Sequence, residues 1–396
     1  MNNRAGIFMD NTNGYQCFIP KPLPPEPPVM IDPEMQNLLS IADRKLGRLD
    51  GVTEILPDPE LFIAMYVKKE ALLSSQIEGT QASLVDVLEF DADLDVTEKR
   101  NHVEEVVNYV AAMNYGLREL EHFPLSLRLI RNIHAELLKG VRGCHRNPGE
   151  FRTSQNWIGP AGCTLSTATF VPPSVPEMNK AMGDLELFFY DESHYIPALI
   201  KIAMIHAQFE TIHPFLDGNG RMGRLLITFW LCQQKILNQP LLYLSYYFKR
   251  NRTEYYDRLM DVRKKGEWEN WIKFFLKGVA EVSDESTKSA KDIIGLKTNL
   301  SQMLLSVNGG IANNEQKLLD LLFTEPIITR KQVEQMLKVS NPTAGSLLDK
   351  FSAMSILQDI TPDRTRNKKY IFADYISILE RGTELDHSTD LISNTY

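Results

Sequence analysis

The chain has 396 residues, which is enough for two or three domains. Its composition, 43% hydrophobic and 24% charged, is ordinary for a globular protein, and its net charge of −8 excludes a general electrostatic attraction to nucleic acid or anionic membranes. No apolar run reaches the roughly 18–20 residues that cross a bilayer, and the first residues lack a signal-peptide pattern. The four cysteines form no CxxC pair, so we expect reduced thiols in a cytoplasmic protein.

The first 30 residues end in the proline-rich run PKPLPPEPP at 20–28. This composition favours an extended, polyproline-like arm rather than a core element. Such an arm suits either an SH3-like partner or a strap packed over the rest of the chain, and we favour the strap.

Residues 33 to about 277 predict one helix after another. We expect breaks at Pro57, at 91–93, at Pro124 and across the Gly/Pro-rich stretch 140–176.

One helix of this series is expected to run through the residues before Gly79, which fits a C-terminal stop. Ser74 and Glu78 lie four residues apart and hence on one face of it. From spacing alone, Glu78 is an exposed glutamate at a helix end. A carboxylate is mildly disfavoured there by the helix dipole, and a cation partner would relieve that misfit.

Two short β-prone runs, 156–163 and 167–173, surround Gly/Pro turns inside the otherwise helical region. They predict a β-hairpin, with a long surface loop as the alternative.

Residues 213–224, HPFLDGNGRMGR, join two apolar helical stretches, and the second helix is predicted to start at or near Asn219. A glycine-rich turn that opens a helix directs backbone N–H groups and the positive dipole end at an anion such as phosphate. Arg221 and Arg224 add two permanently charged forks for phosphate oxygens.

The same segment holds a carboxylate and a base. Asp217 offers hard oxygen ligands of the kind that Mg²⁺ requires, and His213 is the group here that titrates near neutral pH. Each piece alone is an ordinary turn or loop. Together they are hard to explain as packing, because a structural turn needs neither two arginines nor a base.

Residues 246–256, YYFKRNRTEYY, mix aromatic and cationic side chains, which suits either stacking on a purine or ordinary helix packing. Trp268, Trp271 and 274–275 are predicted to be core residues of one helix.

The C-terminal region predicts helices at 315–323 and 330–337, and a third one starting at Ser340. Strands are expected at 356–360 and 369–372. Three helices and a hairpin resemble a winged helix-turn-helix.

Charge argues against strong DNA binding by this region. Residues 311–380 contain nine Lys and Arg and nine Asp and Glu, and only the wing around 364–369 is locally basic. A phosphate-tracking surface carries more excess charge. A protein-contact or weak nucleic-acid module is therefore preferred. The polar residues 281–307 are expected to form a linker helix.

Residues 213–224 match, position for position, the Fic-domain signature His-Pro-Phe-x-Asp/Glu-Gly-Asn-Gly-Arg-x-x-Arg, so the chain resembles this family. Fic proteins mostly transfer AMP from ATP to a hydroxyl of a target protein. The resemblance implies that His213 deprotonates a Ser, Thr or Tyr hydroxyl and that Asp217 holds Mg²⁺ or Mn²⁺. It implies ATP contacts at Gly218, Asn219, Gly220, Arg221, Met222, Gly223 and Arg224.

Residues 74–79 likewise resemble the family's inhibitory motif, Ser/Thr-x-x-x-Glu-Gly/Asn. The resemblance implies that Glu78, with Ser74 and Gly79, holds the second arginine, Arg224, and occupies the place of the γ-phosphate.

Further contacts also follow from the resemblance alone. It implies a flap at about 156–173 that binds the target protein by adding a strand to its edge, and an adenine pocket near Arg250, Tyr255 and Tyr256. Many Fic proteins dimerise, although no residue here indicates a homodimer.

We therefore expect a mainly α fold: a Fic-type helical bundle with a small β-hairpin flap and a winged helix-turn-helix domain. The expected parts are an N-terminal Fic-associated region with the arm and inhibitory helix, a Fic catalytic core, a linker helix and a winged-helix-like domain, at 1–110, 111–280, 281–310 and 311–396.

The leading hypothesis is an autoinhibited protein adenylyltransferase that modifies a target protein and itself. One alternative is removal of AMP by the same site, with Glu78 positioning water. Another is a DNA-binding regulator whose Fic site senses nucleotide. Phosphotransfer is disfavoured because that branch of the family carries a lysine where this chain has Gly220.

Overall fold

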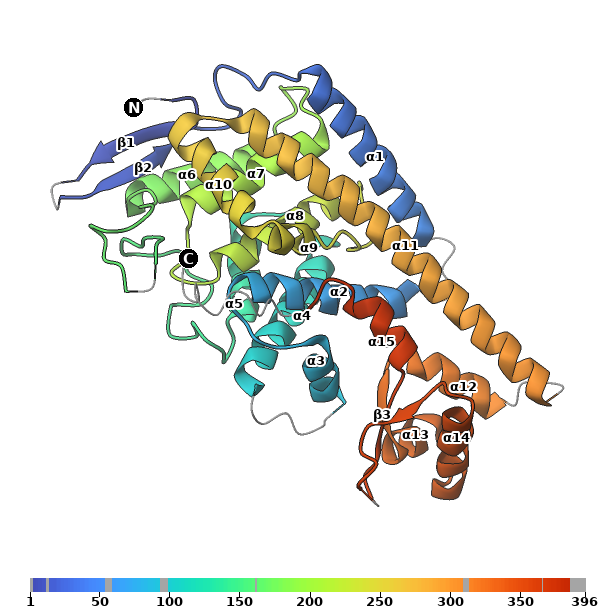
Figure 1. Cartoon of the computed structure of the whole chain (residues 1–396). Helices are drawn as coiled ribbons and strands as arrows, with labels where there is room; N and C mark the ends of the chain where they lie inside the picture. The colour runs from blue at the N-terminus through green and yellow to red at the C-terminus, as the bar shows by residue number, and fades with distance from the viewer. Residues whose placement is uncertain are drawn as a thin grey trace.

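The computed structural model describes residues 3–11, 14–53, 59–92, 99–160, 162–308, 313–364 and 366–384. These residues are mainly helical, as predicted (Figure 1). The helices are α1 Pro33–Thr53, α2 Pro59–Ile77, α3 Leu84–Asp91, α4 Arg100–Leu120, α5 Leu127–Leu137, α6 Val175–Phe189, α7 Ala198–Ile212, α8 Asn219–Gln233, α9 Ser245–Arg250, α10 Arg252–Lys265, α11 Trp268–Asn308, α12 Asn313–Leu322, α13 Arg330–Leu337, α14 Asn341–Ala353 and α15 Ala373–Glu380. The strands are β1 Gly6–Asp10, β2 Gln16–Pro20, β3 Ile327–Thr329, β4 Gln358–Asp359 and β5 Lys369–Ile371.

Two of the predicted helix breaks, Pro57 and the end of the 91–93 turn, lie outside the described residues. The breaks at Pro124 and across 140–176 are present, because α4 ends before the former and no helix of the described chain covers most of the latter. No helix of the described ranges is both long and apolar enough to cross a membrane.

The N-terminal arm contains a β-hairpin, so the prediction of an extended arm outside the core is wrong for residues 6–20. Strands β1 and β2 pair antiparallel with Phe8 opposite Phe18, and Phe18 is fully buried. The backbone N–H of Phe18 donates to Val171 O at 2.9 Å. A Cβ at Gly6 would lie 2.3 Å from Ile19 O, so the close approach of the strands there requires glycine.

The core of the helical part is built around α7 and α8. Every residue of α7 from Leu199 to Ile212 is buried, so this helix is covered on all sides, as its sequence, apolar nearly all round, predicts. The turn between α7 and α8 is therefore carried by two elements that cannot shift without disturbing the core.

Helix α11 joins the two ends of the molecule. It is one 41-residue helix that packs along α1, and Figure 1 shows it continuing to the C-terminal elements. Trp268 and Trp271 are buried, which confirms their assignment to the core. The linker helix predicted at 281–310 is, over its described residues 281–308, the second part of this helix, which contains Gly278 and Gly295 but no proline and continues without a break.

The predicted C-terminal elements occur where the sequence places them, with two additions. Helices α12, α13 and α14 are followed by β4 and β5, and the sheet has the order β3-β5-β4 with antiparallel pairs. Thr329 and Ser340 cap α13 and α14 with their side-chain oxygens. Strand β3 and helix α15 are the unpredicted elements. The winged helix-turn-helix remains our interpretation of this arrangement.

The segment after α15 returns to the end of α2, the helix that precedes Glu78. Gln76 Nε2 donates to Thr383 O at 3.2 Å, and Lys249 Nζ donates both to Gln76 Oε1 at 2.8 Å and to Glu384 O. Arg381 and Asp292 of α11 form an ion pair at 2.6 Å. The C-terminal segment is thus in hydrogen-bond contact with the inhibitory-motif helix.

Candidate functional site

The turn between α7 and α8 is closed by Asn219. Its Oδ1 accepts from Phe215 N at 2.9 Å and its Nδ2 donates to Phe215 O at 2.8 Å. Helix α7 ends at His213, whose φ of +51° turns the chain sharply, and α8 begins at Asn219, where the sequence predicts it. Because both polar groups of one buried amide bind one backbone unit, the loop has a single fixed shape.

His134 of α5 supports the turn from below. Its ring stacks on Phe215 at 3.7 Å between centroids, and its two nitrogens contact Asp217 O and Gly149 N, each at 2.9 Å. The N–H of Gly149 can only donate, so Nδ1 accepts and Nε2 carries the proton given to Asp217 O. Burial lowers the pKa of His134 to about 4, which agrees with this neutral tautomer.

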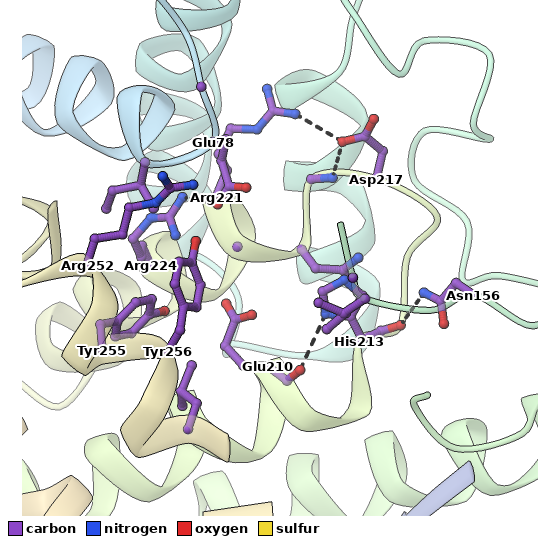
Figure 2. Close-up of a pocket in the computed structure, with 18 of the residues that line it drawn as sticks. Glu78, Asn156, Glu210, His213, Asp217, Arg221, Arg224, Arg252, Tyr255 and Tyr256 are labelled. Carbon is purple, nitrogen blue, oxygen red and sulfur yellow. Dashed lines mark hydrogen bonds and ion pairs between the residues drawn. The ribbon is translucent and has the colours of Figure 1, made fainter. Parts of the chain in front are cut away.

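The turn opens into a cavity of about 490 Å³ lined by several elements (Figure 2). The end of α2, the 156–159 segment, the last turn of α7, the first turn of α8 and helix α10 all contribute residues. Residues far apart in the sequence, such as Glu78, His213 and Tyr256, therefore face one space.

His213 lies in this cavity with its backbone fixed from outside. Its carbonyl oxygen accepts from Arg152 Nε at 3.1 Å and from Asn156 Nδ2 at 3.1 Å. Burial, with the nearby charges of Arg263 and Arg152, lowers the pKa of His213 to about 3. The imidazole is therefore neutral at pH 7 and able to accept a proton.

The first turn of α8 forms an anion-binding end of the cavity. Gly218, with φ of +75°, is the N-cap, and among the described residues no side chain caps the helix. Arg221 is 1% exposed, and its Nη2 donates to Asp217 Oδ1 at 3.3 Å. Its Nε and Nη1 have no hydrogen-bond partner within the described ranges. Free N–H groups, a helix N-terminus and a buried guanidinium make this end suited to phosphate.

Arg224 is bound by the end of α2. Its Nε donates to Ser74 Oγ at 2.7 Å, and its Nη2 donates to Ser74 O at 2.9 Å and to Glu78 Oε1 at 2.7 Å. The side chain of Arg224 is 2% exposed. Glu78 follows the last residue of α2, and Gly79, with φ of +94°, turns the chain away, as its helix-stop role predicts.

The carboxylate of Glu78 covers the first turn of α8. A Cβ at Gly220 would lie 2.2 Å from Glu78 Oε1, which measures how closely that oxygen approaches the backbone of the helix. Burial raises the pKa of Glu78, but the charge of and hydrogen bond from Arg224, with Arg221 and Arg252, outweigh it and hold that pKa below its ordinary value. At neutral pH a charged carboxylate thus lies where an anion would bind.

Another wall of the cavity is aromatic and aliphatic, formed by Tyr255, Tyr256, Leu259 and Met260 of α10. Tyr255 is held by its hydroxyl, which lies 2.9 Å from His206 Nε2. Arg252 also lines the cavity and lies over the ring of Tyr256.

Three expected ATP contacts lie outside the set of described residues that line the cavity. Arg250 instead forms an ion pair with Glu281 of α11. A break at Asn251 separates α9 from α10, so Arg250 and Arg252 point in different directions. Met222 is fully buried, and Gly223 turns its backbone toward His206, whose Nδ1 lies 3.0 Å from Gly223 O. Both belong to the buried face of α8.

In the described residues of 156–173, the predicted hairpin is reduced to isolated bridging, including the antiparallel bridge between Ile158 and Phe170. Ile158 N donates to Phe170 O at 2.8 Å, and Phe170 N donates to Ile158 O at 3.0 Å. The described residues between them form turns, because the Gly/Pro content interrupts any ladder. Trp157, Ile158 and Gly159 line the cavity beside His213.

No group of three or more His, Cys, Asp or Glu that could hold a metal occurs in the described parts of the chain. Asp217 is the one signature carboxylate, and its Oδ1 accepts from Gly218 N at 2.6 Å. A single carboxylate still suits Mg²⁺, which usually takes its other ligands from substrate phosphates and water. All four cysteines, each in the described ranges, are free thiols.

Several cavity residues are not indicated as site residues by the sequence. Glu210, Arg252 and Arg263 line the cavity, and Arg152 and Asn156 fix His213. Arg252 belongs to the aromatic and cationic run at 246–256, where the structure selects it over Arg250. Asn156 opens the β-prone run at 156–163, which indicates no contact with His213. Glu210, Arg152 and Arg263 lie in no motif and reach the site only through tertiary folding.

Family models match two consecutive parts of the chain: "Fic/DOC family N-terminal" over residues 36–118 and "Fic/DOC family" over residues 124–231. The chain therefore contains the N-terminal and Fic domains of the Fic/DOC family. Both the α2 motif and the 213–224 signature lie within these regions. This membership accounts for the joint occurrence of the two motifs in one cavity.

Relatives of this Fic chain include proteins named protein adenylyltransferase. The protein adenylyltransferase Fic of Aedes aegypti is 30% identical over 204 residues, which cover 50% of this chain and 37% of the relative. A probable protein adenylyltransferase of Aquifex aeolicus is 26% identical over 215 residues, covering 54% of this chain and 60% of the relative. The chain thus spans less than two thirds of the length of these relatives.

Solved structures share the fold. A Fic family protein from Desulfovibrio desulfuricans G20 superposes with a TM-score of 0.57 at 20% identity, covering 87% of this chain and 97% of that one. A Fic domain containing signaling protein from Bacteroides thetaiotaomicron gives a TM-score of 0.50 at 18% identity, covering 62% and 97%. The first match extends over most of the chain, including more than the two Fic regions.

Proposed function

We propose that this Fic protein is a protein adenylyltransferase that transfers AMP from ATP to a Ser, Thr or Tyr hydroxyl of a target protein. The observation that carries the proposal is one cavity holding a neutral, half-buried histidine, His213, beside an anion-binding helix N-terminus with a buried arginine, Arg221. The names of the relatives support the same chemistry.

In the proposed reaction the target hydroxyl oxygen attacks the α-phosphorus of ATP. Its proton passes to the imidazole of His213, and the bond to pyrophosphate breaks as the new P–O bond forms. The first turn of α8 and Arg221 stabilise charge on the phosphate oxygens. Asp217 would hold Mg²⁺, which would neutralise charge on the bridging phosphates.

The target protein is proposed to bind along residues 156–173. Beside the bridge between Ile158 and Phe170, the backbone near Trp157 lies next to His213. A target strand added there would place the target's hydroxyl at His213, the proposed base. Trp157 is 43% exposed and lies at the edge of this segment.

Autoinhibition by Glu78 is the second part of the proposal. The carboxylate competes with phosphate for Arg224 and for the space over Gly220. Breaking one side of a buried ion pair is costly, so ATP is held in an unproductive position until Glu78 moves.

A second candidate reaction, hydrolytic removal of AMP from a modified protein, uses the same residues. It is favoured by one observation: Glu78 is charged and lies in the cavity with His213, as a carboxylate that positions water must. Release of AMP from an adenylylated protein by wild type, and its loss in Glu78→Gly, would support this reaction over transfer.

The test uses ATP labelled at either the α- or the γ-phosphate. The Glu78→Gly chain is incubated with Mg²⁺ and a protein mixture, and incorporated label is located by mass spectrometry. The proposal expects incorporation from α-labelled ATP and none from γ-labelled ATP. Incorporation from γ-labelled ATP would indicate phosphotransfer. Incorporation from neither labelled ATP would contradict both AMP transfer and phosphotransfer.

A further inference from the structure

Glu210 is a buried carboxylate that the proposed reaction does not use. It lies on the last turn of α7, three residues before His213, is 6% exposed and lines the cavity. Its Oε1 is buried and accepts no hydrogen bond from the residues that the structure describes. A carboxylate oxygen is costly to bury without a donor, so this atom is suited to a donor that arrives with a ligand.

The position of the carboxylate is fixed on both sides. Arg263 Nη2 donates to the backbone oxygen of Glu210 at 3.0 Å, which anchors its main chain. A Cβ at Gly223 would lie 2.4 Å from Glu210 Oε1, so the glycine leaves the room that the carboxylate occupies against α8. The side chain is thus held at the cavity wall rather than free to turn away.

Neighbouring charges do not satisfy Glu210 fully. Arg224 attracts it, but the guanidinium is already hydrogen-bonded to Ser74 and Glu78. Burial, with the like charge of Glu78, raises the pKa of Glu210 to about 7 in spite of Arg224 and Arg263. Oε1 of Glu210 therefore has no hydrogen-bond partner among the described residues while Glu78 is paired with Arg224.

The cavity offers the kinds of surface that a nucleotide needs. The first turn of α8 with Arg221 suits phosphate, and Tyr256 with Leu259 and Met260 forms an aromatic and aliphatic wall that suits a base. Figure 2 shows Glu210 between Tyr256 and His213. In a nucleotide, the group between phosphate and base is the sugar, whose hydroxyls are hydrogen-bond donors.

We infer that Glu210 accepts a hydrogen bond from a ribose hydroxyl of bound ATP and makes the site selective for ribonucleotides over deoxyribonucleotides. This rests on the proposed function only in that ATP is the ligand. Carboxylates recognise ribose hydroxyls in this way in dinucleotide-binding folds. A site built to bind a hydroxyl rejects the analogue that lacks it, because its own polar group is left unpaired.

The experiment compares binding of ATP, 2′-deoxy-ATP and 3′-deoxy-ATP to the full chain by calorimetry, with Glu78→Gly present throughout to remove the competing carboxylate. With Glu210 intact, we expect one deoxy analogue to bind about tenfold more weakly than ATP, as for the loss of a hydrogen bond to a charged group. Glu210→Ala should bind ATP about tenfold more weakly and no longer distinguish the analogue that lacks that hydroxyl.

Two further variants separate recognition from structure. Glu210→Gln keeps the shape and one acceptor oxygen, so it should fold normally and retain part of the discrimination. Glu192→Gln, an exposed glutamate outside the cavity, should leave all three affinities unchanged. Equal weakening of ATP and both analogues by Glu210→Ala would mean a structural role only and would overturn the inference.

The outcome is independent of catalysis. Equal affinities for all three nucleotides with Glu210 intact overturn the ribose contact even if AMP transfer occurs. A ribose preference that depends on Glu210, in a chain that transfers no AMP, supports the contact and contradicts the proposed function. Failure of every nucleotide to bind would contradict both.

Discussion

Nη2 of Arg224 and Oε1 of Glu78 lie 2.7 Å apart, although 146 residues separate them in the chain. The pair joins the inhibitory-motif helix to the signature helix at the anion-binding end of the cavity. Both side chains are mostly buried, with 2% and 19% exposed, so neither charge has water as an easy alternative partner. A phosphate group that reaches this place must displace Glu78 from Arg224.

Ser74→Ala should weaken this inhibition without removing it. The change deletes the acceptor of Arg224 Nε and leaves a buried charged donor unpaired, which costs about 1–3 kcal/mol. We expect AMP transfer several-fold above wild type but below Glu78→Gly, measured as label incorporated from ATP. Ser75→Ala is the matched control, because Ser75 is equally buried and its Oγ has no hydrogen-bond partner in the described chain. Equal rates in both variants would exclude a role for the Ser74 hydroxyl.

Asn219→Ala should abolish transfer and lower stability together. The amide binds both backbone groups of Phe215. Without it the buried N–H of Phe215 loses its partner, at a cost of about 1–3 kcal/mol, while Phe215 O keeps the hydrogen bond from Asn156 Nδ2 at 2.9 Å. We expect a lower melting temperature and no incorporation even with Glu78→Gly present. Asn270→Ala, at an exposed asparagine of α11, serves as the control. A stable, active Asn219→Ala chain would show that the loop does not depend on this amide.

The pH dependence of kcat should lack the usual histidine limb. The acting form of His213 is neutral, and its pKa of about 3 instead of 6.5 keeps it neutral as pH falls. At saturating ATP, kcat of Glu78→Gly should therefore not fall between about pH 8 and pH 5 on account of this group. Saturation matters because Glu210, whose pKa is about 7, is expected to act on ATP affinity. A decline in kcat with a midpoint near 6.5 would contradict the neutral-base assignment.

Loosening the C-terminal segment should raise AMP transfer in a chain that keeps Glu78. Lys249 bridges Gln76 of α2 and Glu384, so Lys249→Ala removes a restraint two residues before Glu78. We expect transfer to increase about two- to fivefold, since a partly exposed bridge contributes little free energy. Lys265→Ala, at an exposed ion pair of α10, is the control. If Lys249→Ala and Lys265→Ala both match wild type, the Lys249 bridge does not restrain α2.

The cavity's central motif could be predicted because its residues are consecutive. Residues 213–224 predict the start of α8 at Asn219. They also place the base, the carboxylate and the two arginines in the turn and the first residues of that helix. The inhibitory role of Ser74, Glu78 and Gly79 follows only from the resemblance, since the residues alone predict a helix stop at Gly79 and an exposed glutamate at position 78. Their contact with Arg224 is a product of the tertiary fold.

Other features had no local signal. Strands β1 and β2 lie before a proline-rich run, and the composition of that run favours an extended arm. The pairing of the two strands nevertheless buries Phe18. Arg250 and Arg252 are two residues apart, and only the break at Asn251 decides which faces the cavity. Glu210, Arg152 and Asn156 act through contacts with segments distant in sequence, so no periodicity or motif could indicate them.

The most direct test of the central claim is the initial rate of AMP incorporation from α-labelled ATP by wild type, Glu78→Gly and the double variant Glu78→Gly/His213→Ala. We expect little transfer by wild type and a large increase in Glu78→Gly, because Glu78 blocks Arg224. The double variant should return to background, because His213 supplies the base. Equal rates in wild type and Glu78→Gly, or undiminished transfer without His213, would contradict it.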